Sequence, residues 1–98
     1  MSKSSALSSG LLAAGTTTVV NRKSLLNGVV AISDGTNTAT VTVYDNASTA
    51  TGTVLAKAVA TSAAPTSSNF TTNHVRADNG ITVVVAGTGS GAIIYFDA

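Results

Sequence analysis

Several residue types that carry chemistry in other proteins are absent or scarce in this chain. Cysteine, tryptophan and glutamate are missing, and the 98 residues include one proline, one histidine and four aromatic side chains. Without cysteine there is no disulfide framework and no thiol chemistry. Because no apolar run approaches the roughly 18 residues of a membrane span, we expect no transmembrane helix and no membrane partner.

Charge is scarce as well. Charged residues make up 9% of the sequence and the formal net charge is +1, whereas about a quarter of a typical soluble domain is charged. Binding nucleic acid requires a cluster of Lys and Arg, and the five such residues here are scattered. We therefore expect no nucleic-acid partner.

Small side chains dominate what is present. The sequence has 12 Ser and 16 Thr, and most of its apolar residues are Ala or Val. Burying a large apolar side chain contributes roughly 1.5–3 kcal/mol, and alanine contributes much less. A short chain with an alanine-rich core is marginally stable alone. Since neither disulfides nor a metal site are evident, we expect a homo-oligomer.

Residues 1–15 differ in texture from the rest and are predicted to form a flexible N-terminal arm, followed by a β-sandwich domain over residues 16–98. The arm is rich in Ser, Ala and Gly and shows no periodicity. Ser8-Ser9-Gly10 interrupts its apolar residues, so it lacks the 7–15-residue apolar core of a secretory signal. Two interpretations stay open, a disordered terminus and an arm that orders on a neighbouring subunit. The second would remove Leu7, Leu11 and Leu12 from water.

A period of two residues recurs through the remaining sequence. In Thr38–Tyr44, the apolar Ala39, Val41 and Val43 share one face and threonines share the other, which is typical of a half-buried strand. In Thr53–Thr61 the alternation places Leu55 and Val59 on one face and Val54, Ala56, Ala58 and Ala60 on the other, although these alanines would also suit a helix. Further strands are expected at Thr16–Asn21, Ser24–Ser33, Phe70–Arg76, Ile81–Ala86 and Ala92–Asp97.

Turn residues separate these segments about every ten positions. Asp34-Gly35-Thr36-Asn37 and Asp78-Asn79-Gly80 are turn sequences, and a loop is expected over Ser62–Asn69 around Pro65. No segment has a convincing helical period. The pattern predicts an all-β fold, either an antiparallel β-sandwich or a jelly-roll-like barrel.

The stretch Gly87-Thr88-Gly89-Ser90-Gly91 has the glycine spacing of a nucleotide-binding loop. Such a loop needs a helix after the glycines, and here Ala92–Phe96 is β-branched and aromatic. The lysine of a Walker loop is also missing. We therefore predict a flexible hairpin connection between two strands and no nucleotide cofactor.

No arrangement of polar residues predicts catalysis. His74 stands alone, with no motif that supplies a nucleophile and an orienting acid, and one histidine without cysteine falls short of a metal site. Three of the four acids, Asp34, Asp45 and Asp78, accompany turn sequences, where Asp side chains bond backbone amides. We expect no enzyme activity, no metal and no other cofactor.

The cations Arg22, Lys23 and Arg76 have two interpretations, solvated side chains or contacts to an acidic partner surface. The exposed faces of the strands, by contrast, would be neutral Thr, Ser and Ala. Such faces lack the Lys and Glu with which monomeric proteins keep sheet edges apart. They can pack against another protein at a small desolvation cost, because hydroxyls bond backbone groups readily. This favours a structural or binding role.

The chain resembles small β-rich structural proteins of tailed bacteriophages in two segments. These are LNGVVAISDGTNTATVTVYDNASTATGTVLAKAV and HVRADNGITVVVAGTGSGAIIYFD. The resemblance covers about residues 25–97 and is carried by turn and strand signatures. These are Tyr44-Asp45-Asn46, Gly52-Thr53, Asn79-Gly80-Ile81, Gly87-Thr88-Gly89 and Ala92–Tyr95. Proteins of this kind are virion components, and some are capsid decoration, or cement, proteins.

The resemblance implies a non-catalytic virion protein. We expect a homotrimeric capsid decoration protein that is assembled in the host cytoplasm and binds the major capsid protein on the capsid surface. The alternative is a tail, fibre or head-spike module that binds a host surface ligand. The residues expected to contact the capsid or a sister subunit are Leu7, Leu11, Leu12, Arg22 and Lys23.

Overall fold

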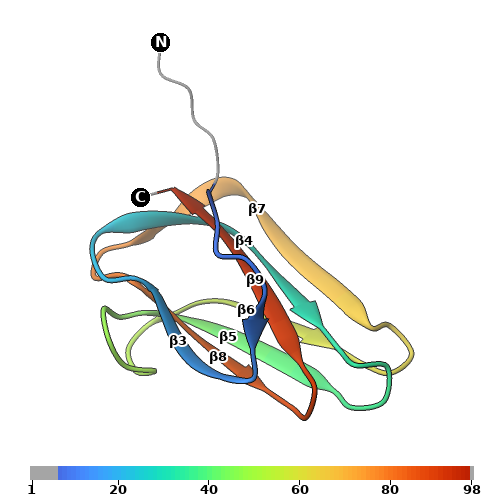
Figure 1. Ribbon diagram of the computed structural model, residues 1–98. Helices are drawn as coiled ribbons and strands as arrows, with labels where there is room; N and C mark the ends of the chain where they lie inside the picture. Colours follow the sequence, from blue (N-terminus) through green and yellow to red (C-terminus); the bar gives the residue numbers. More distant parts are fainter. Residues whose placement is uncertain (1–6, 98) are drawn as a thin grey trace.

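The protein folds into two antiparallel β-sheets packed face to face (Figure 1). The computed structural model describes residues 7–97, and for residues 70–74 the backbone alone. This range contains nine strands and no helix. The predicted all-β sandwich is confirmed, and neither sheet closes into a barrel.

One sheet has five strands. β4 (Ser24–Ile32) lies at its centre between β7 (Thr66–Ala77) and β9 (Gly91–Asp97), and the other edge of β9 pairs with two short strands, β1 (Leu7–Ser8) and β2 (Leu12–Ala13). In the ladder between β4 and β9, Val29 lies opposite Ile94 and Ala31 lies opposite Ala92. β4 and β9 are therefore the two interior strands of this sheet.

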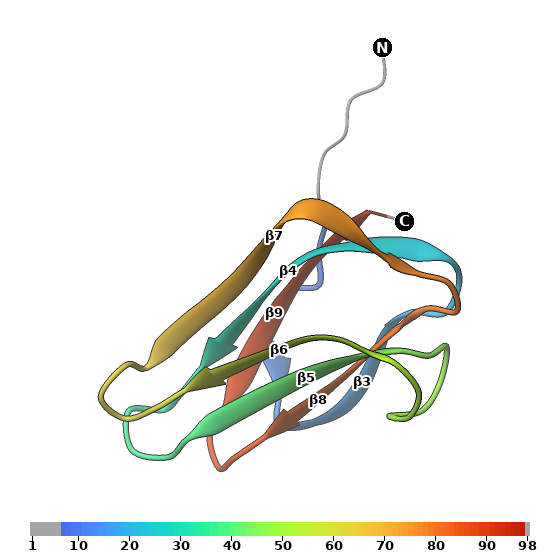
Figure 2. The same cartoon turned by 180° about the vertical axis from the view of Figure 1, so that it is seen from behind.

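The second sheet has four strands. Their order is β3 (Gly15–Val20), β8 (Ile81–Ala86), β5 (Ala39–Asp45) and β6 (Val54–Ala60). The predicted alternation in β5 is confirmed, because Ala39, Val41 and Val43 are fully buried. Figure 2 shows this sheet from the opposite side, with β6 and β7 as the strands at the same lateral edge.

The core lies between the two sheets and is built largely from small side chains. Its largest fully buried members include Leu26, Ile81 and Ile94. Six of the sixteen buried apolar residues are alanines, so the sheets approach closely but bury little area per residue. The buried alanines are Ala31, Ala39, Ala58, Ala60, Ala77 and Ala92.

Strand β7 begins earlier than the sequence suggested. The predicted loop over Ser62–Asn69 is wrong in its second half, because Thr66–Asn69 pairs with β4. Pro65 has no N–H to donate to a ladder and precedes the strand. Its carbonyl accepts a hydrogen bond of 2.7 Å from the Ser33 N–H, just after β4.

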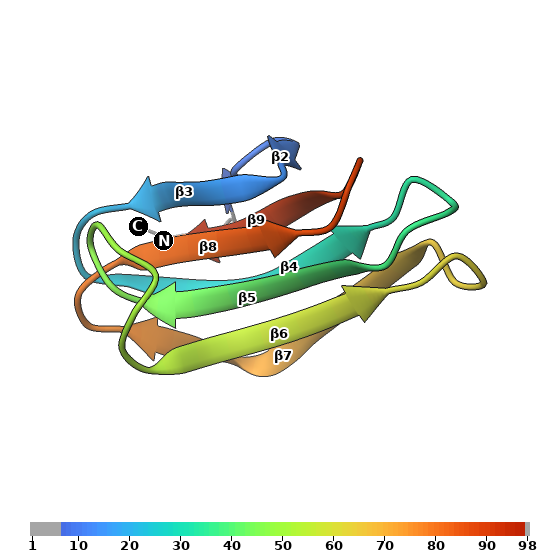
Figure 3. The ribbon, with the colours of Figure 1, turned by 90° about the horizontal axis from the view of Figure 1, so that it is seen from below.

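The glycine-rich stretch is not a hairpin, contrary to the prediction. β8 belongs to the four-stranded sheet and β9 to the five-stranded sheet, so Gly87-Thr88-Gly89-Ser90-Gly91 crosses from one layer to the other (Figure 3). Turn residues mark where a strand ends but not which sheet the next strand joins. The loop is held by Ser90, whose N–H and hydroxyl both donate to the Gly87 carbonyl, at 3.3 and 2.5 Å.

The prediction that Val54 shares a face of its strand with Ala58 and Ala60 is also wrong. The register of β5 and β6 shifts between Val43 and Tyr44, so that Val43 lies opposite Ala56 and Tyr44 opposite Val54. This β-bulge leaves Leu55 as the extra residue and turns Val54 outward. Val54 is consequently 50% exposed, whereas Ala58 and Ala60 are buried as expected.

Substitutions at Gly87 and Gly35 test how much the close packing of the crossing loops contributes to stability. Gly87 has φ +120°, and a Cβ there would collide with the Thr38 carbonyl. Gly35 has φ +94° but nothing within 4 Å of its Cβ position. We expect Gly87→Ala to lower the free energy of unfolding by about 3–5 kcal/mol and Gly35→Ala by about 1–2 kcal/mol. Chemical denaturation measures both, and equal losses would contradict the packing argument.

Candidate functional site

The described part of the N-terminal arm pairs with strand β9 of the same chain. Leu7 is opposite Phe96 and Leu12 is opposite Ala92 in the β9 ladder. Between them the Ser9 N–H donates to the Ile94 carbonyl at 2.8 Å, and the Ile94 N–H donates to the Ser9 hydroxyl at 2.9 Å. Residues 1–6 of the predicted arm lie outside the described residues.

The leucines of this segment differ in burial. Leu12 packs against the core, whereas Leu7 is 50% and Leu11 is 70% exposed. Leu11 and Leu12 line a hollow of about 230 Å³ beside Gly89 and Gly91, close to the glycine-rich crossing loop. Docking on β9 therefore partly buries Leu12 and leaves Leu7 and Leu11 exposed.

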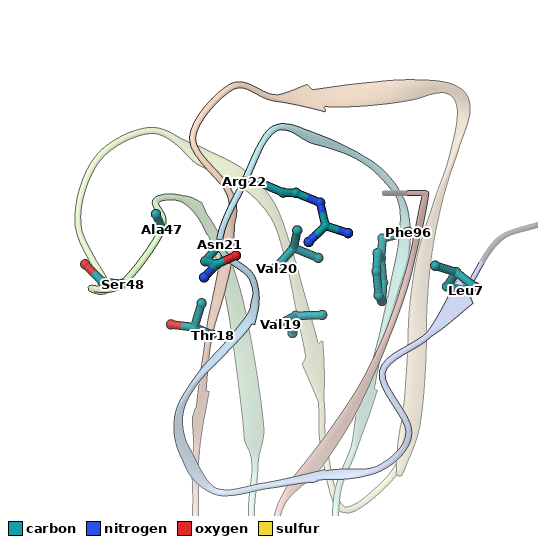
Figure 4. Close-up of a pocket in the computed structure, with 9 residues that line it drawn as sticks. All are labelled: Leu7, Thr18, Val19, Val20, Asn21, Arg22, Ala47, Ser48 and Phe96. Atoms are coloured by element: carbon teal, nitrogen blue, oxygen red, sulfur yellow. The ribbon is translucent and has the colours of Figure 1, made fainter.

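Leu7 and Arg22, which are far apart in the sequence, line the same cleft (Figure 4). Its volume is about 720 Å³, and it opens at the edge where β1 and β9 of one sheet face β3 of the other. Val20 and Phe96 are nearly buried and contribute apolar surface to it. The remaining lining residues are Thr18, Val19, Asn21, Ala47 and Ser48.

Lys23 occupies a different hollow. A space of about 330 Å³ is lined by Lys23, Ser24 and Leu25 of the chain entering β4, together with Arg76 and Asp97. Arg76 is already engaged, because its Nε lies 3.1 Å from Oδ1 of Asp78. The five predicted contact residues thus fall into three separate hollows, and only Leu7 with Arg22 and Leu11 with Leu12 share one.

Sequence reasoning missed the outward face of the five-stranded sheet. There Val30 lies opposite Ile93, and most of the half-buried side chains of β4 and β9 around this pair are also apolar, except that Asn27 donates a hydrogen bond to Asp97 near one end. Together they form what we call the apolar face: Leu25, Val30, Ile32, Ile93 and Tyr95.

The opposite sheet alternates more clearly along β5, where Thr40 and Thr42 face outward and Val41 and Val43 are fully buried. Its outward face also includes three apolar side chains on the neighbouring strands, Val54, Val59 and Val84. Antiparallel sheets with one solvated face alternate in this way, and strands covered on both faces read as continuous apolar runs. Val29–Ile32 and Ala92–Phe96 are such runs, and they were the available signal for the apolar face.

The Asp34 carboxylate closes the connection between β4 and β5. It accepts hydrogen bonds from the backbone N–H groups of Thr36 and Asn37, both at 2.8 Å, and from the Asn37 side-chain amide at 3.0 Å. The bond from the Asn37 backbone, followed by that from Thr36, lowers the pKa of Asp34 from its ordinary value.

Asp34 also bears on the glycine-rich loop. A Cβ on Gly89 would lie 2.6 Å from Oδ2 of Asp34, so the carboxylate abuts this loop. An anionic phosphate there would meet a negative charge. The position of Asp34 therefore agrees with the sequence argument against a phosphate cradle.

The Asp45 carboxylate also bonds a backbone amide of a turn. Asp45 accepts a hydrogen bond of 2.8 Å from the Asn79 N–H and so ties the end of β5 to the connection between β7 and β8. Within the described part of the chain, no three His, Cys, Asp or Glu residues gather as a metal ion would require. The prediction for His74 lies outside the described side chains.

None of the described segments is a helix of the length and hydropathy that crossing a membrane requires. No protein-family model, curated protein or solved structure matches this chain.

Asp34→Asn tests the role of the negative charge, because asparagine keeps an oxygen that accepts hydrogen bonds. The lowered pKa means that the carboxylate stabilises the fold above its ordinary pKa of 3.8, and that this contribution is lost as pH falls through the lower folded-state value. We expect the wild type to melt above the variant at about pH 6 and the difference to shrink towards about pH 2.5. A melting difference independent of pH would contradict this role.

Proposed function

We propose that this chain is a non-catalytic virion structural protein, and specifically a capsid decoration protein that binds the assembled shell of the major capsid protein. The observation that carries the proposal is the apolar face. All five of its members lie on β4 and β9, the two interior strands of one sheet, on the side away from the protein's own core. A surface of this kind is stabilised when another protein covers it.

The shape of the apolar face favours a protein partner over a small molecule. Small ligands bind in concave pockets that enclose most of their surface, whereas this face is the outside of a β-sheet. Charged side chains lie at one end of it, where Arg76 and Asp97 flank Leu25 in the β-ladders. Such an arrangement, an apolar centre with charges at the rim, is typical of protein interfaces.

Stabilisation of the shell would follow from mass action. A protein that binds the assembled shell but not its dissociated subunits shifts the equilibrium towards the shell. The face of one copy is modest in size, and many copies, or a trimer with three such faces, add their contributions through multivalency. The exposed Leu11, which lines a hollow together with Ile32, extends the apolar surface at the β9 edge of the molecule.

Copy number in purified virions tests the proposal directly. Quantitative mass spectrometry should find hundreds of copies in fixed ratio to the major capsid protein, because a decoration protein covers the shell. A handful to a few dozen copies would contradict the shell location and favour a tail or fibre module. Absence from virions would overturn the structural role.

A matched pair of variants tests the face itself. Val30→Asp places a charge at the centre of the apolar face, and Thr42→Asp places the same charge on the outward face of the other sheet, also on a central strand. We expect Val30→Asp to weaken binding to shells by more than about tenfold, because an unpaired charge would be buried there. Thr42→Asp should bind as the wild type does.

Co-sedimentation with purified shells measures both affinities, and thermal melting shows that each variant is folded. Equal binding by the two variants would contradict the assignment of the apolar face as the contact surface.

A further inference from the structure

We infer that the cleft beside Arg22 is a second binding site, which takes a carboxylate joined to an apolar group on an acidic, apolar segment of a partner protein. The apolar face is broad and lies on the outside of one sheet. The cleft is a separate, concave feature at the edge between the sheets, and it combines apolar surface with one cation.

The course of the chain creates the cleft. β2 continues into β3 through Ala14, which joins the two sheets at one end of this edge. At the other end, Leu7 belongs to the five-stranded sheet and Val20 to the four-stranded sheet, and the cleft lies between them. No strand of the described chain spans this gap.

The apolar wall of the cleft is preformed. Phe96 is 8% and Val20 is 5% exposed, so both are fixed by the core and present only a small surface. Leu7, which lies opposite Phe96 in the β-ladder, is half exposed. Phe96 and Val20 can contact an aliphatic or aromatic group without first rearranging, which lowers the entropic cost of binding, and Leu7 can cover the group from the other side.

Arg22 provides the charge. Of the described residues that line the cleft, Arg22 alone is charged, and its side chain extends toward Val20 and Phe96 (Figure 4). Among the described side chains the four acids are engaged elsewhere: Asp34 and Asp45 hold turns, Asp78 pairs with Arg76, and Asp97 accepts a hydrogen bond from Asn27 and lines a different hollow. None of these four carboxylates lines this cleft.

The chemistry of the ligand follows from these groups. A guanidinium binds a carboxylate through two parallel hydrogen bonds. This interaction is stronger where apolar surface excludes water. Asn21 and Ser48 add neutral polar groups at the rim. A single cation favours one carboxylate over a polyanion, because nucleic acid requires several phosphate contacts. An Asp or Glu next to a large apolar residue meets all these requirements.

The identity of the partner rests on the proposed function, since a shell would present such a segment many times. The chemistry of the site is tested without a shell. The probe is 3-phenylpropionate, which joins a carboxylate to an aromatic ring, and the control is 3-phenylpropan-1-ol, which has the same ring and chain but no charge.

Both compounds are titrated into ¹⁵N-labelled protein, and the amide chemical shifts are followed. We expect saturable shifts at Thr18–Arg22 and Ala47–Ser48, with binding of the carboxylate at least about fivefold tighter than that of the alcohol. Equal affinities, or shifts centred on other residues, would overturn the inference. Concentration-dependent shifts of the same amides without any probe would also overturn it, because a second copy would then occupy the cleft.

Charge-matched variants complete the test. Arg22→Gln should reduce the affinity for the carboxylate at least about fivefold and leave that for the alcohol unchanged. Lys57→Gln removes the same charge from β6, at the other edge of the sandwich, and should change neither. Equal effects of the two variants would show a general response to net charge and contradict the site.

The two proposals fail in distinguishable ways. Loss of shell binding in Val30→Asp, with no preference for the carboxylate probe, contradicts the cleft and supports the apolar face. Binding of the probe at Arg22 in a protein that is absent from virions supports the site and contradicts the decoration role.

Discussion

The packing of two sheets through small side chains is the constraint on which the rest of the structure depends. Alanines at Ala31, Ala39 and Ala92 let the layers approach closely, but each contributes little transfer free energy. The fold is therefore stabilised also at its ends, where Asp34, Asp45 and Ser90 bond the backbone of the crossing loops. A protein built in this way has a strong reason to gain further stability from its neighbours.

Much of the fold could be predicted because its signals are local. The period of two in Thr38–Tyr44 and the turn at Asp78-Asn79-Gly80 depend only on neighbouring residues, and the structure has a strand and a turn there. The sheet that the chain joins after Gly87–Gly91 could not be predicted from local signals. A glycine-rich connection serves a hairpin and a crossing equally well, and the pairing of β9 with β4 is decided by residues some sixty positions away. The bulge at Leu55 likewise has no signal in its own segment.

The candidate site was predictable in part. The leucines of the arm were chosen because they are costly to leave in water, and Leu7 and Leu11 are indeed exposed. That Leu7 meets Arg22 depends on the register of β1 against β9, which the sequence does not encode in any short pattern. The apolar face had a visible signal in Val29–Ile32 and Ala92–Phe96, but continuous apolar runs indicate burial on both faces without telling which face a partner covers.

The crossing loops have a consequence for how the chain reaches this structure. Almost every ladder joins distant residues, such as Leu7 with Phe96, Thr16 with Val84 and Ser24 with Ala77. Topologies dominated by such distant pairings fold slowly, because loop-closure entropy is lost before the contacts form. β4 has both of its partners, β7 and β9, more than thirty residues downstream. During synthesis its apolar run must therefore wait, exposed, until most of the chain has left the ribosome, and the chain is at greatest risk of aggregation in that interval.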